Sequence, residues 1–149
     1  ASEDIGNANP NALLLANNCF QAVNVIGFPE SRIILSQCVT YMASSVKSNA
    51  SYMAINHAQA LVKQTGDLPV PLHLRNAPTK LMKQLGFGEG YRYAHDEAGA
   101  YAAGERYLPA ELAGQQFYQP VERGMEKQLA EKLRYLKQLD ADSPRKRDK

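Results

Sequence analysis

The 149-residue sequence has no tryptophan, only two cysteines, and no apolar run of the roughly 18 residues that a membrane-spanning helix needs. Charge of one sign is also scarce, because 17 lysines and arginines face 15 acidic residues, a formal net charge of +2. The sequence therefore lacks the basic excess of a dedicated nucleic-acid coat. Cys19 and Cys38 lie in apolar helical patterns, so we expect two free, buried thiols, as in a reducing cytoplasm.

A nucleotide-binding loop is missing as well. The glycines between Gly86 and Gly90 superficially suggest a phosphate cradle, but a P-loop ends in Gly-Lys-Ser/Thr and opens a helix, and here Glu89 lies in the middle. A turn explains these glycines better, because glycine adopts turn conformations at little cost. We expect no catalytic residue and no cofactor site in this chain.

Metal-binding and nucleophilic motifs are equally hard to find. His95 is followed by two acidic residues, but neighbours in sequence point in different directions, so a metal site would need distant partners such as His57 or His73. No serine or cysteine lies near a histidine in a recognisable motif. We expect no metal site, and we interpret His73 and His95 as hydrogen-bonded parts of loops.

Hydrophobic periodicity predicts an all-α domain over residues 1–139. The expected helices cover residues 10–26, 29–46, 49–63, 78–85 and 109–113, and a last one begins at Pro120. Asn9 is expected to cap the first helix, and Ser48 or Asn49 the third. Very short loops between the first three helices predict antiparallel neighbours in a bundle.

The helix expected at 10–26 is apolar around most of its circumference, which is typical of a helix covered by several neighbours in a large core or an oligomer. The second helix has apolar residues opposite a polar stripe. From these two patterns we expect self-association, with an interface that includes Leu14, Phe20, Ile34 and Met42.

The stretch from Leu68 to Asp96 departs from helical periodicity. Pro69 and Pro71 alternate with leucine and valine, which favours an extended strip with one apolar face. A loop rich in glycine and tyrosine follows the short helix at 78–85. We expect both segments to pack on the helical bundle.

This stretch also carries a candidate contact surface for DNA or a partner, made of Arg75, Lys80, Lys83, Arg92, Tyr91 and Tyr93. Lys80 and Lys83 share one helical face, and interleaved tyrosines would suit base stacking. In the alternative interpretation the two arginines anchor loops by binding backbone carbonyls or nearby carboxylates. The sequence leaves both open.

Residues 140–149 are charged and contain proline, a composition that predicts a flexible basic tail. We expect deletion of residues 142–149 to leave the fold intact.

Several longer segments resemble one protein family over essentially the whole chain. They are ASEDIG at the start, KSNA at 47–50, HLRNAPTKLMK, GYRYAHDEAGAYAAGE, YLPAEL and the terminal SPRKR. The chain resembles the C-terminal region of the bacterial replication-associated recombination protein A family, also called maintenance of genome stability protein A. Its eukaryotic relatives include the Werner helicase-interacting protein.

The resemblance implies a fold like the C-terminal oligomerisation domain of clamp loaders, and a cytoplasmic, nucleoid-associated AAA+ ATPase that acts at stalled replication forks. It implies a homotetramer, with single-stranded or forked DNA and single-strand-binding protein as partners of the whole protein. The family's ATPase module, with its ATP and Mg²⁺, would lie upstream of Ala1, so this chain would carry assembly and no hydrolysis. A helical DNA-binding module that uses the basic patch is the alternative.

Overall fold

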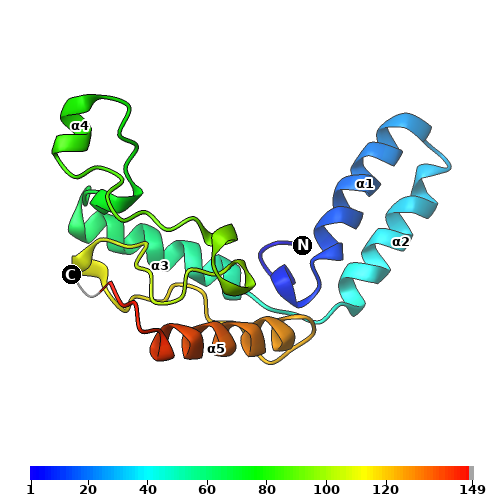
Figure 1. Cartoon of the computed structure of the whole chain (residues 1–149). Coiled ribbons are helices and arrows are strands. Elements are labelled where there is room, and N and C mark those ends of the chain that lie inside the picture. Colours follow the sequence, from blue (N-terminus) through cyan, green and yellow to red (C-terminus); the bar gives the residue numbers. More distant parts are fainter. Residues whose placement is uncertain (148–149) are drawn as a thin grey trace. The chain divides into compact units, whose positions relative to one another are not determined.

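The computed structural model of the chain describes residues 1–147. Five α-helices follow one another in Figure 1: α1 (Asn11–Ile26), α2 (Ser31–Ser44), α3 (Ala50–Thr65), α4 (Lys80–Gln84) and α5 (Glu126–Asp142). Short 3-10 turns occupy Gly6–Ala8, Leu72–Leu74, Ala94–Asp96, Ala98–Ala100 and Ala110–Leu112. No strand occurs in the described part, so the prediction of an all-α fold is confirmed. None of these helices is long and apolar enough to cross a bilayer.

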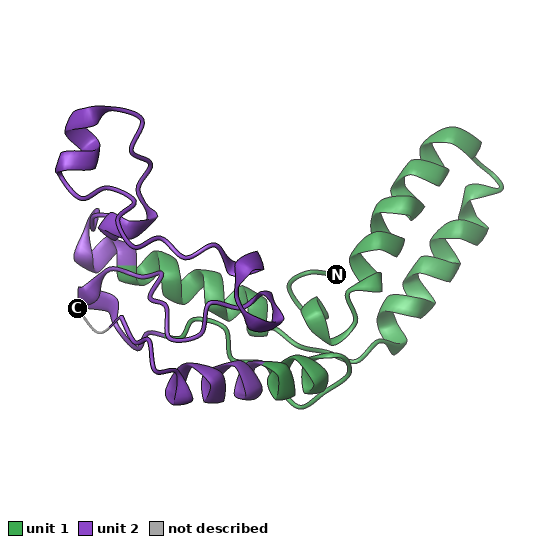
Figure 2. Cartoon of the chain, in the orientation of Figure 1, with its two compact units in different colours: residues 1–61, 116–132 green, residues 62–115, 133–149 purple. Residues whose placement is uncertain are grey.

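The chain divides into two compact units, shown in Figure 2. Unit 1 contains residues 1–61 and 116–132, and unit 2 contains residues 62–115 and 133–149. Two helices therefore run from one unit into the other: α3 leaves unit 1 at its end, and α5 begins in unit 1. The predicted division at residue 140 stays a prediction.

In unit 1, α1 and α2 pack side by side as a hairpin. Cys19 and Cys38 are buried and free, as predicted, and the Cys19 thiol faces the carbonyl oxygen of Ile34 at 3.8 Å. α3 makes no comparable packing with either helix, so the prediction of three antiparallel neighbours holds only for the first two.

The side chain of Asn9, which precedes α1, binds the last turn of α2. The sequence predicted it instead as the cap of α1. Its amide nitrogen donates to the hydroxyls of Tyr41 at 3.0 Å and Ser45 at 3.1 Å, and the Tyr41 hydroxyl donates back to its amide oxygen at 3.2 Å. Pro10 takes the capping position without a side-chain bond. Asn9 thus fixes the start of α1 against the end of α2.

Glu126 is the polar centre of unit 1. Its carboxylate is fully buried and accepts hydrogen bonds from the hydroxyl of Ser48 at 2.8 Å, the hydroxyl of Tyr118 at 3.0 Å and the backbone N–H of Val121 at 2.8 Å. These bonds hold residues 118–125 as a loop. They explain why α5 begins at Glu126 and not at Pro120, as the sequence predicted.

Unit 2 consists mostly of loops and single helical turns. The predicted extended strip is interrupted by the 3-10 turn at Leu72–Leu74, and the helix predicted at 109–113 is only the turn Ala110–Leu112. Asp140, near the end of α5, accepts hydrogen bonds from the Tyr101 hydroxyl at 2.8 Å and the backbone N–H of Gly104 at 2.9 Å. A carboxylate on the helix thus ties the loop to it.

The charged end of the chain is more ordered than its composition predicted. α5 continues through Asp142, and the side chains of Arg145 and Arg147 pair with Glu97 and Glu105. The composition of residues 140–149 could not predict this order, because the acidic partners lie elsewhere in the chain. The part of the predicted tail at 148–149 lies outside the described residues.

Candidate assembly surface

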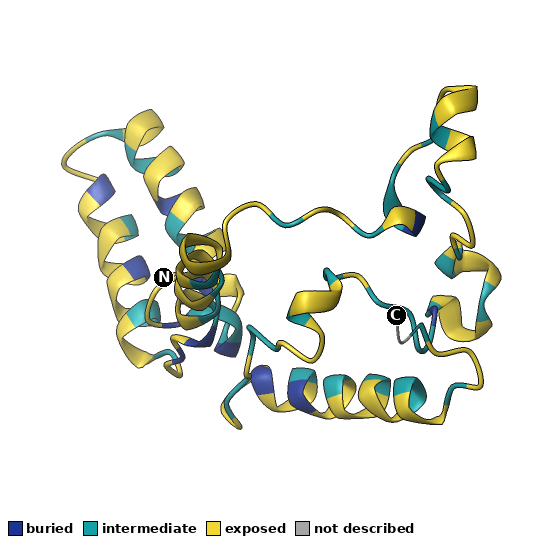
Figure 3. Cartoon of the chain, turned by 90° about the vertical axis from the view of Figure 1, so that its left-hand side faces the viewer, coloured by how far each residue is buried: buried dark blue, intermediate teal, exposed yellow. Residues whose placement is uncertain are grey.

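The α1–α2 hairpin exposes many large apolar side chains. Figure 3 colours most of its ribbon as exposed. Its side chains with between 52% and 85% of their area exposed are Leu13, Leu14, Phe20, Val25, Ile26, Phe28, Ile33 and Val39. α1 contains no charged residue, and Arg32 is the one charged residue of α2. Large apolar side chains exposed in this number, beside the exposed polar residues Asn17, Gln21 and Asn24 of α1, are typical of a binding face, because monomeric soluble proteins rarely expose large apolar patches.

The buried core is correspondingly thin. The apolar residues that are buried among those described are Ile5, Ala8, Ala12, Cys19, Cys38, Ala50, Ala102 and Ala130. Five of these eight are alanines, whose burial removes little apolar area from water, whereas a fully buried leucine or phenylalanine stabilises by about 1.5–3 kcal/mol. The large apolar side chains of the hairpin therefore add little to the buried core of the single chain.

The total accessible surface area of the chain is also larger than expected for compact domains of its mass. The chain exposes 10662 Å² for a mass of 16.5 kDa. Two separate globular bodies of half this mass would together expose about 9,100 Å² by the usual scaling of area with mass. The chain thus exposes on the order of 1,500 Å² more than two independent small domains would.

The four predicted interface residues fall in different surroundings. Leu14 and Phe20 are exposed on α1, at 62% and 63%. Ile34 is partly covered on α2, where its carbonyl faces the Cys19 thiol, and Met42 is partly covered near the end of α2. The side chains of Leu14 and Phe20 are therefore accessible to another molecule, whereas those of Ile34 and Met42 are partly covered by their own chain.

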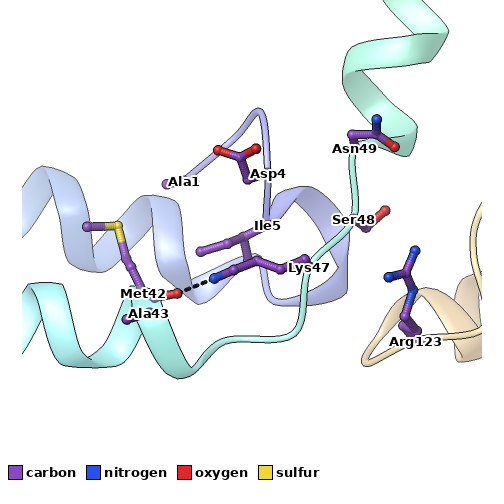
Figure 4. Close-up of a pocket in the computed structure, with 9 residues that line it drawn as sticks. All are labelled: Ala1, Asp4, Ile5, Met42, Ala43, Lys47, Ser48, Asn49 and Arg123. Atoms are coloured by element: carbon purple, nitrogen blue, oxygen red, sulfur yellow. Dashed lines mark hydrogen bonds between the residues drawn. The ribbon is translucent and has the colours of Figure 1, made fainter.

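Met42 lines a pocket of about 560 Å³ beside the start of α3, drawn in Figure 4. Its charged residues are Asp4, Lys47 and Arg123, mixed with the apolar side chains of Ile5 and Met42. The ammonium of Lys47 donates to the carbonyl of Met42, at the end of α2. This lysine therefore caps a helix.

The two arginines of the predicted basic patch are engaged with their own chain. The Arg75 guanidinium donates to the carbonyl of Val70 at 2.6 Å and lies 5.0 Å from the centre of the Phe87 ring. Arg92 donates to Glu97 at 2.8 Å and to the carbonyl of Ala103 at 2.7 Å. These contacts are the anchoring that the sequence left open as an alternative.

The remaining members of the patch face solvent. Lys80 and Lys83 are exposed on α4, and Tyr91 and Tyr93 are more than half exposed. The Tyr93 ring lies 5.0 Å from that of His95, in a tilted arrangement. The available surface is thus two lysines and two tyrosines.

Ion pairs shift the pKa values of unit 2. The hydrogen bond from Arg92 lowers the pKa of the Glu97 carboxyl, and the same bond raises the pKa of Arg92. For Glu105, burial alone would raise the pKa of the carboxyl, but hydrogen bonds from the Arg147 side chain and the Arg106 N–H, with the charges of Arg147 and His73, lower it overall. Both carboxylates are held in their charged form.

Buried His73 was predicted as a hydrogen-bonded loop residue, and its ring is placed accordingly. Its Nε2 lies 2.8 Å from the carbonyl oxygen of Arg106 and 3.2 Å from Glu105. His95 is exposed beside Tyr93.

Glu105, Glu126 and Asp140 are structural centres that the sequence did not single out. Each is an acidic residue of ordinary appearance with at least one partner far away along the chain, up to 78 residues for the bond between Ser48 and Glu126. A carboxylate at the first position of an amphipathic helix was the one available signal for Glu126, because such residues favour helix N-termini.

Comparison with known families identifies the chain. Residues 1–137 match the family model described as MgsA AAA+ ATPase C terminal. The chain belongs to this family.

Several proteins similar to this chain are named replication-associated recombination protein A. The chain is 51% identical to the protein of that name from Coxiella burnetii over 140 residues, 94% of this chain and 32% of that protein. It is 48% identical to the Escherichia coli K12 protein of the same name over 147 residues, 99% of this chain and 33% of that protein. ATPase WRNIP1 of Dictyostelium discoideum is 40% identical over 119 residues, 80% of this chain and 14% of that protein.

The chain spans about a third of the length of the bacterial relatives named above. It is the C-terminal domain of an AAA+ ATPase family, as the resemblance of its motifs predicted. Between residues 1 and 147, no group of three or more histidine, cysteine or acidic side chains is placed to hold a metal ion. The most distinctive surface of the domain is the apolar hairpin.

Proposed function

We propose that this domain joins copies of a replication-associated AAA+ ATPase into a homotetramer, and that the α1–α2 hairpin forms the contact. The observation that carries the proposal is the exposed, almost uncharged apolar face of the hairpin. Interface centres are poor in charge and rich in large apolar side chains, which is the composition of this face.

The excess exposed area supports more than one contact per chain. A stable interface of standard size buries about 800 Å² on each partner. An excess on the order of 1,500 Å² per chain corresponds to about two such contacts. A tetramer with two different two-fold interfaces uses two contacts per subunit.

A charge placed on the hairpin tests the proposal. Leu14→Glu and Phe20→Glu each introduce a carboxylate at an exposed position, so the single chain tolerates them, but burial in an interface would cost several kcal/mol. We expect light scattering to give a mass near four times 16.5 kDa for the unmodified chain, and at least a tenfold weaker association for both variants. Circular dichroism should show unchanged helix content.

Gln59→Glu is the matched control, because it adds the same charge at an exposed polar position of α3. It should leave the mass unchanged. A monomeric unmodified chain at high concentration, or an oligomer that both hairpin variants leave intact, would contradict the proposal.

The wider activity follows from the family and is proposed for the whole protein. ATP and Mg²⁺ would bind an upstream module, this domain would hydrolyse nothing, and the assembled cytoplasmic, nucleoid-associated protein would act on single-stranded or forked DNA with single-strand-binding protein at stalled forks. Calorimetric titration of this chain with a non-hydrolysable ATP analogue should show no saturable heat. Micromolar binding would contradict this part of the proposal.

A second candidate function is DNA contact through the exposed residues of unit 2. The observation in its favour is that Lys80, Lys83, Tyr91 and Tyr93 are all exposed, with side chains suited to phosphate contact and base stacking. Fluorescence anisotropy with a labelled single strand would test it, comparing the unmodified chain with the Tyr91→Ala, Tyr93→Ala double variant. We expect at least tenfold weaker binding by the variant if this surface is used.

A further inference from the structure

Residues 143–147 lie along the loop that ends at Glu105 in the way a bound peptide would. The backbone N–H of Arg147 donates to the carbonyl of Gly104 at 3.0 Å, and the Ser143 hydroxyl donates to the carbonyl of Ala103 at 2.9 Å. Gly104 has φ +76°, and a Cβ there would collide with the carbonyl oxygen of Arg145. The two backbones therefore meet at a distance that only glycine allows.

The side chain of Arg147 enters a preformed acceptor site. Its Nε donates to Oε1 of Glu105 at 2.6 Å, and its Nη2 donates to Oε2 of Glu105 at 3.3 Å and to the carbonyl of Gly90 at 2.6 Å. The carboxylate is 3% exposed and the guanidinium 29% exposed. A planar fork that meets both carboxylate oxygens is a geometry that arginine provides and lysine does not.

The segment is held by hydrogen bonds and ion pairs, and its one apolar residue, Pro144, is exposed. Three pockets, of about 480, 520 and 230 Å³, include Arg147 in their linings, so open space adjoins the arginine. Order in a segment that buries no large apolar side chain is easily lost, because little apolar burial offsets its conformational entropy.

We propose that Glu105, with the carbonyls of Gly90 and Gly104, forms an arginine-binding site whose ligand is a basic peptide segment, here residues 143–147 of the same chain. The segment is a detachable ligand and not a fixed part of the fold. Its departure would leave Glu105 with the ring of His73, 3.2 Å away, as a remaining side-chain partner at this site. It would also release the carbonyl of Gly90, next to the exposed Tyr91, so occupancy of the site controls the order of this loop.

Hydrogen exchange of the full chain, read by mass spectrometry, tests the proposal. We compare the unmodified chain with Arg147→Ala, with Arg147→Lys, which keeps the charge and loses the fork, and with Lys146→Ala as matched control. Amides of residues 88–106 should exchange at least tenfold faster in Arg147→Ala and by an intermediate factor in Arg147→Lys. Lys146→Ala should match the unmodified chain, because Lys146 is exposed.

A free peptide then separates a binding site from a merely structural contact. Asp-Ser-Pro-Arg-Lys-Arg at millimolar concentration should restore slow exchange to Arg147→Ala, and the same peptide ending in alanine should not. Adding Glu105→Gln should abolish the rescue, because an amide cannot accept both prongs of the fork. Unchanged exchange in Arg147→Ala, or faster exchange that the peptide fails to reverse, would overturn the proposal.

Discussion

The α1–α2 hairpin and the loops of unit 2 face the same shortage of buried apolar side chains and respond in opposite ways. The hairpin is nearly free of charge and leaves side chains such as Phe20 and Val25 uncovered. The loops instead use ion pairs with their own chain, including Arg92 with Glu97 and Arg147 with Glu105. We propose that one region is completed by another molecule, whereas the other contacts its own C-terminal segment.

The largest effect is expected at Glu126, whose side chain is fully buried in unit 1. The Ser48 hydroxyl and the Val121 N–H share its Oε2, so the amide oxygen of Glu126→Gln can replace only that acceptor. The amide NH₂ would then meet the Tyr118 hydroxyl, which donates to Oε1 and already accepts from Asn7, so one buried donor is left unsatisfied. We expect about 2–4 kcal/mol of destabilisation, measured by urea unfolding. Glu131→Gln, exposed on the same helix, is the control, and equal losses in both variants would refute the role of Glu126.

Gly104→Ala tests how unit 2 is completed by its own chain. The added Cβ meets the Arg145 carbonyl oxygen, whereas at Gly99, with a similar φ of +66°, a Cβ meets nothing within 4 Å. Gly99→Ala therefore isolates the cost of the backbone conformation, about 1 kcal/mol. We expect Gly104→Ala to lower the melting temperature several degrees further, and equal losses would mean that the close approach contributes nothing.

Lowering the pH should loosen the loops of unit 2 before it loosens the α1–α2 hairpin. The pKa values of Glu97 and Glu105 are lowered in the fold, so these carboxylates contribute stability that is present above their unfolded pKa values. That contribution is lost as the pH falls below about 4.5 and through the folded values. We expect exchange of amides in residues 90–105 to accelerate with falling pH, after correction for intrinsic rates, before that of α1. If amides of both regions began to exchange faster at the same pH, the proposed difference between the loops and the hairpin would be contradicted.

The smallest effect is expected at Tyr101. Burial, and then the hydrogen bond to Asp140, raises the pKa of this phenol to about 12. The associated stability is complete below pH 10 and is lost as the pH rises through 12. Burial also raises the pKa values of Tyr107 and Tyr118, so absorbance at alkaline pH should show several late-ionising tyrosines. The latest of these ionisations should disappear in Tyr101→Phe, a variant that costs about 1 kcal/mol. If the latest step persists in the variant, it belongs to another residue.

Patterns within a few residues of each other predicted much of the fold. The helices α1, α2 and α3 lie within about two residues of their expected bounds, and Ser48 accepts the backbone N–H of Ala50 at the start of α3, as expected of a cap. Local periodicity and capping residues are sufficient for such elements, because their stabilising contacts are close in sequence.

Long-range polar contacts were beyond prediction. Nothing near Asn9 in the sequence indicates that its side chain binds Tyr41 and not the start of α1, and nothing near Glu105 indicates that residue 147 is its partner. Composition predicted a free tail because it counts the charges of a segment without the opposite charges that the fold brings to it. The apolar residues of α1 did indicate an uncovered face, because this pattern can be read from the sequence of the helix alone.

The absence of charge from α1 has a consequence for ionic strength. An association driven by this helix has no charge pairs for salt to screen, and strongly hydrated salts such as sulfate favour apolar burial. The segment 143–147 depends on charge, so the same salts weaken its hold on Glu105. Raising ionic strength should therefore preserve contacts between subunits while it loosens the end of each chain.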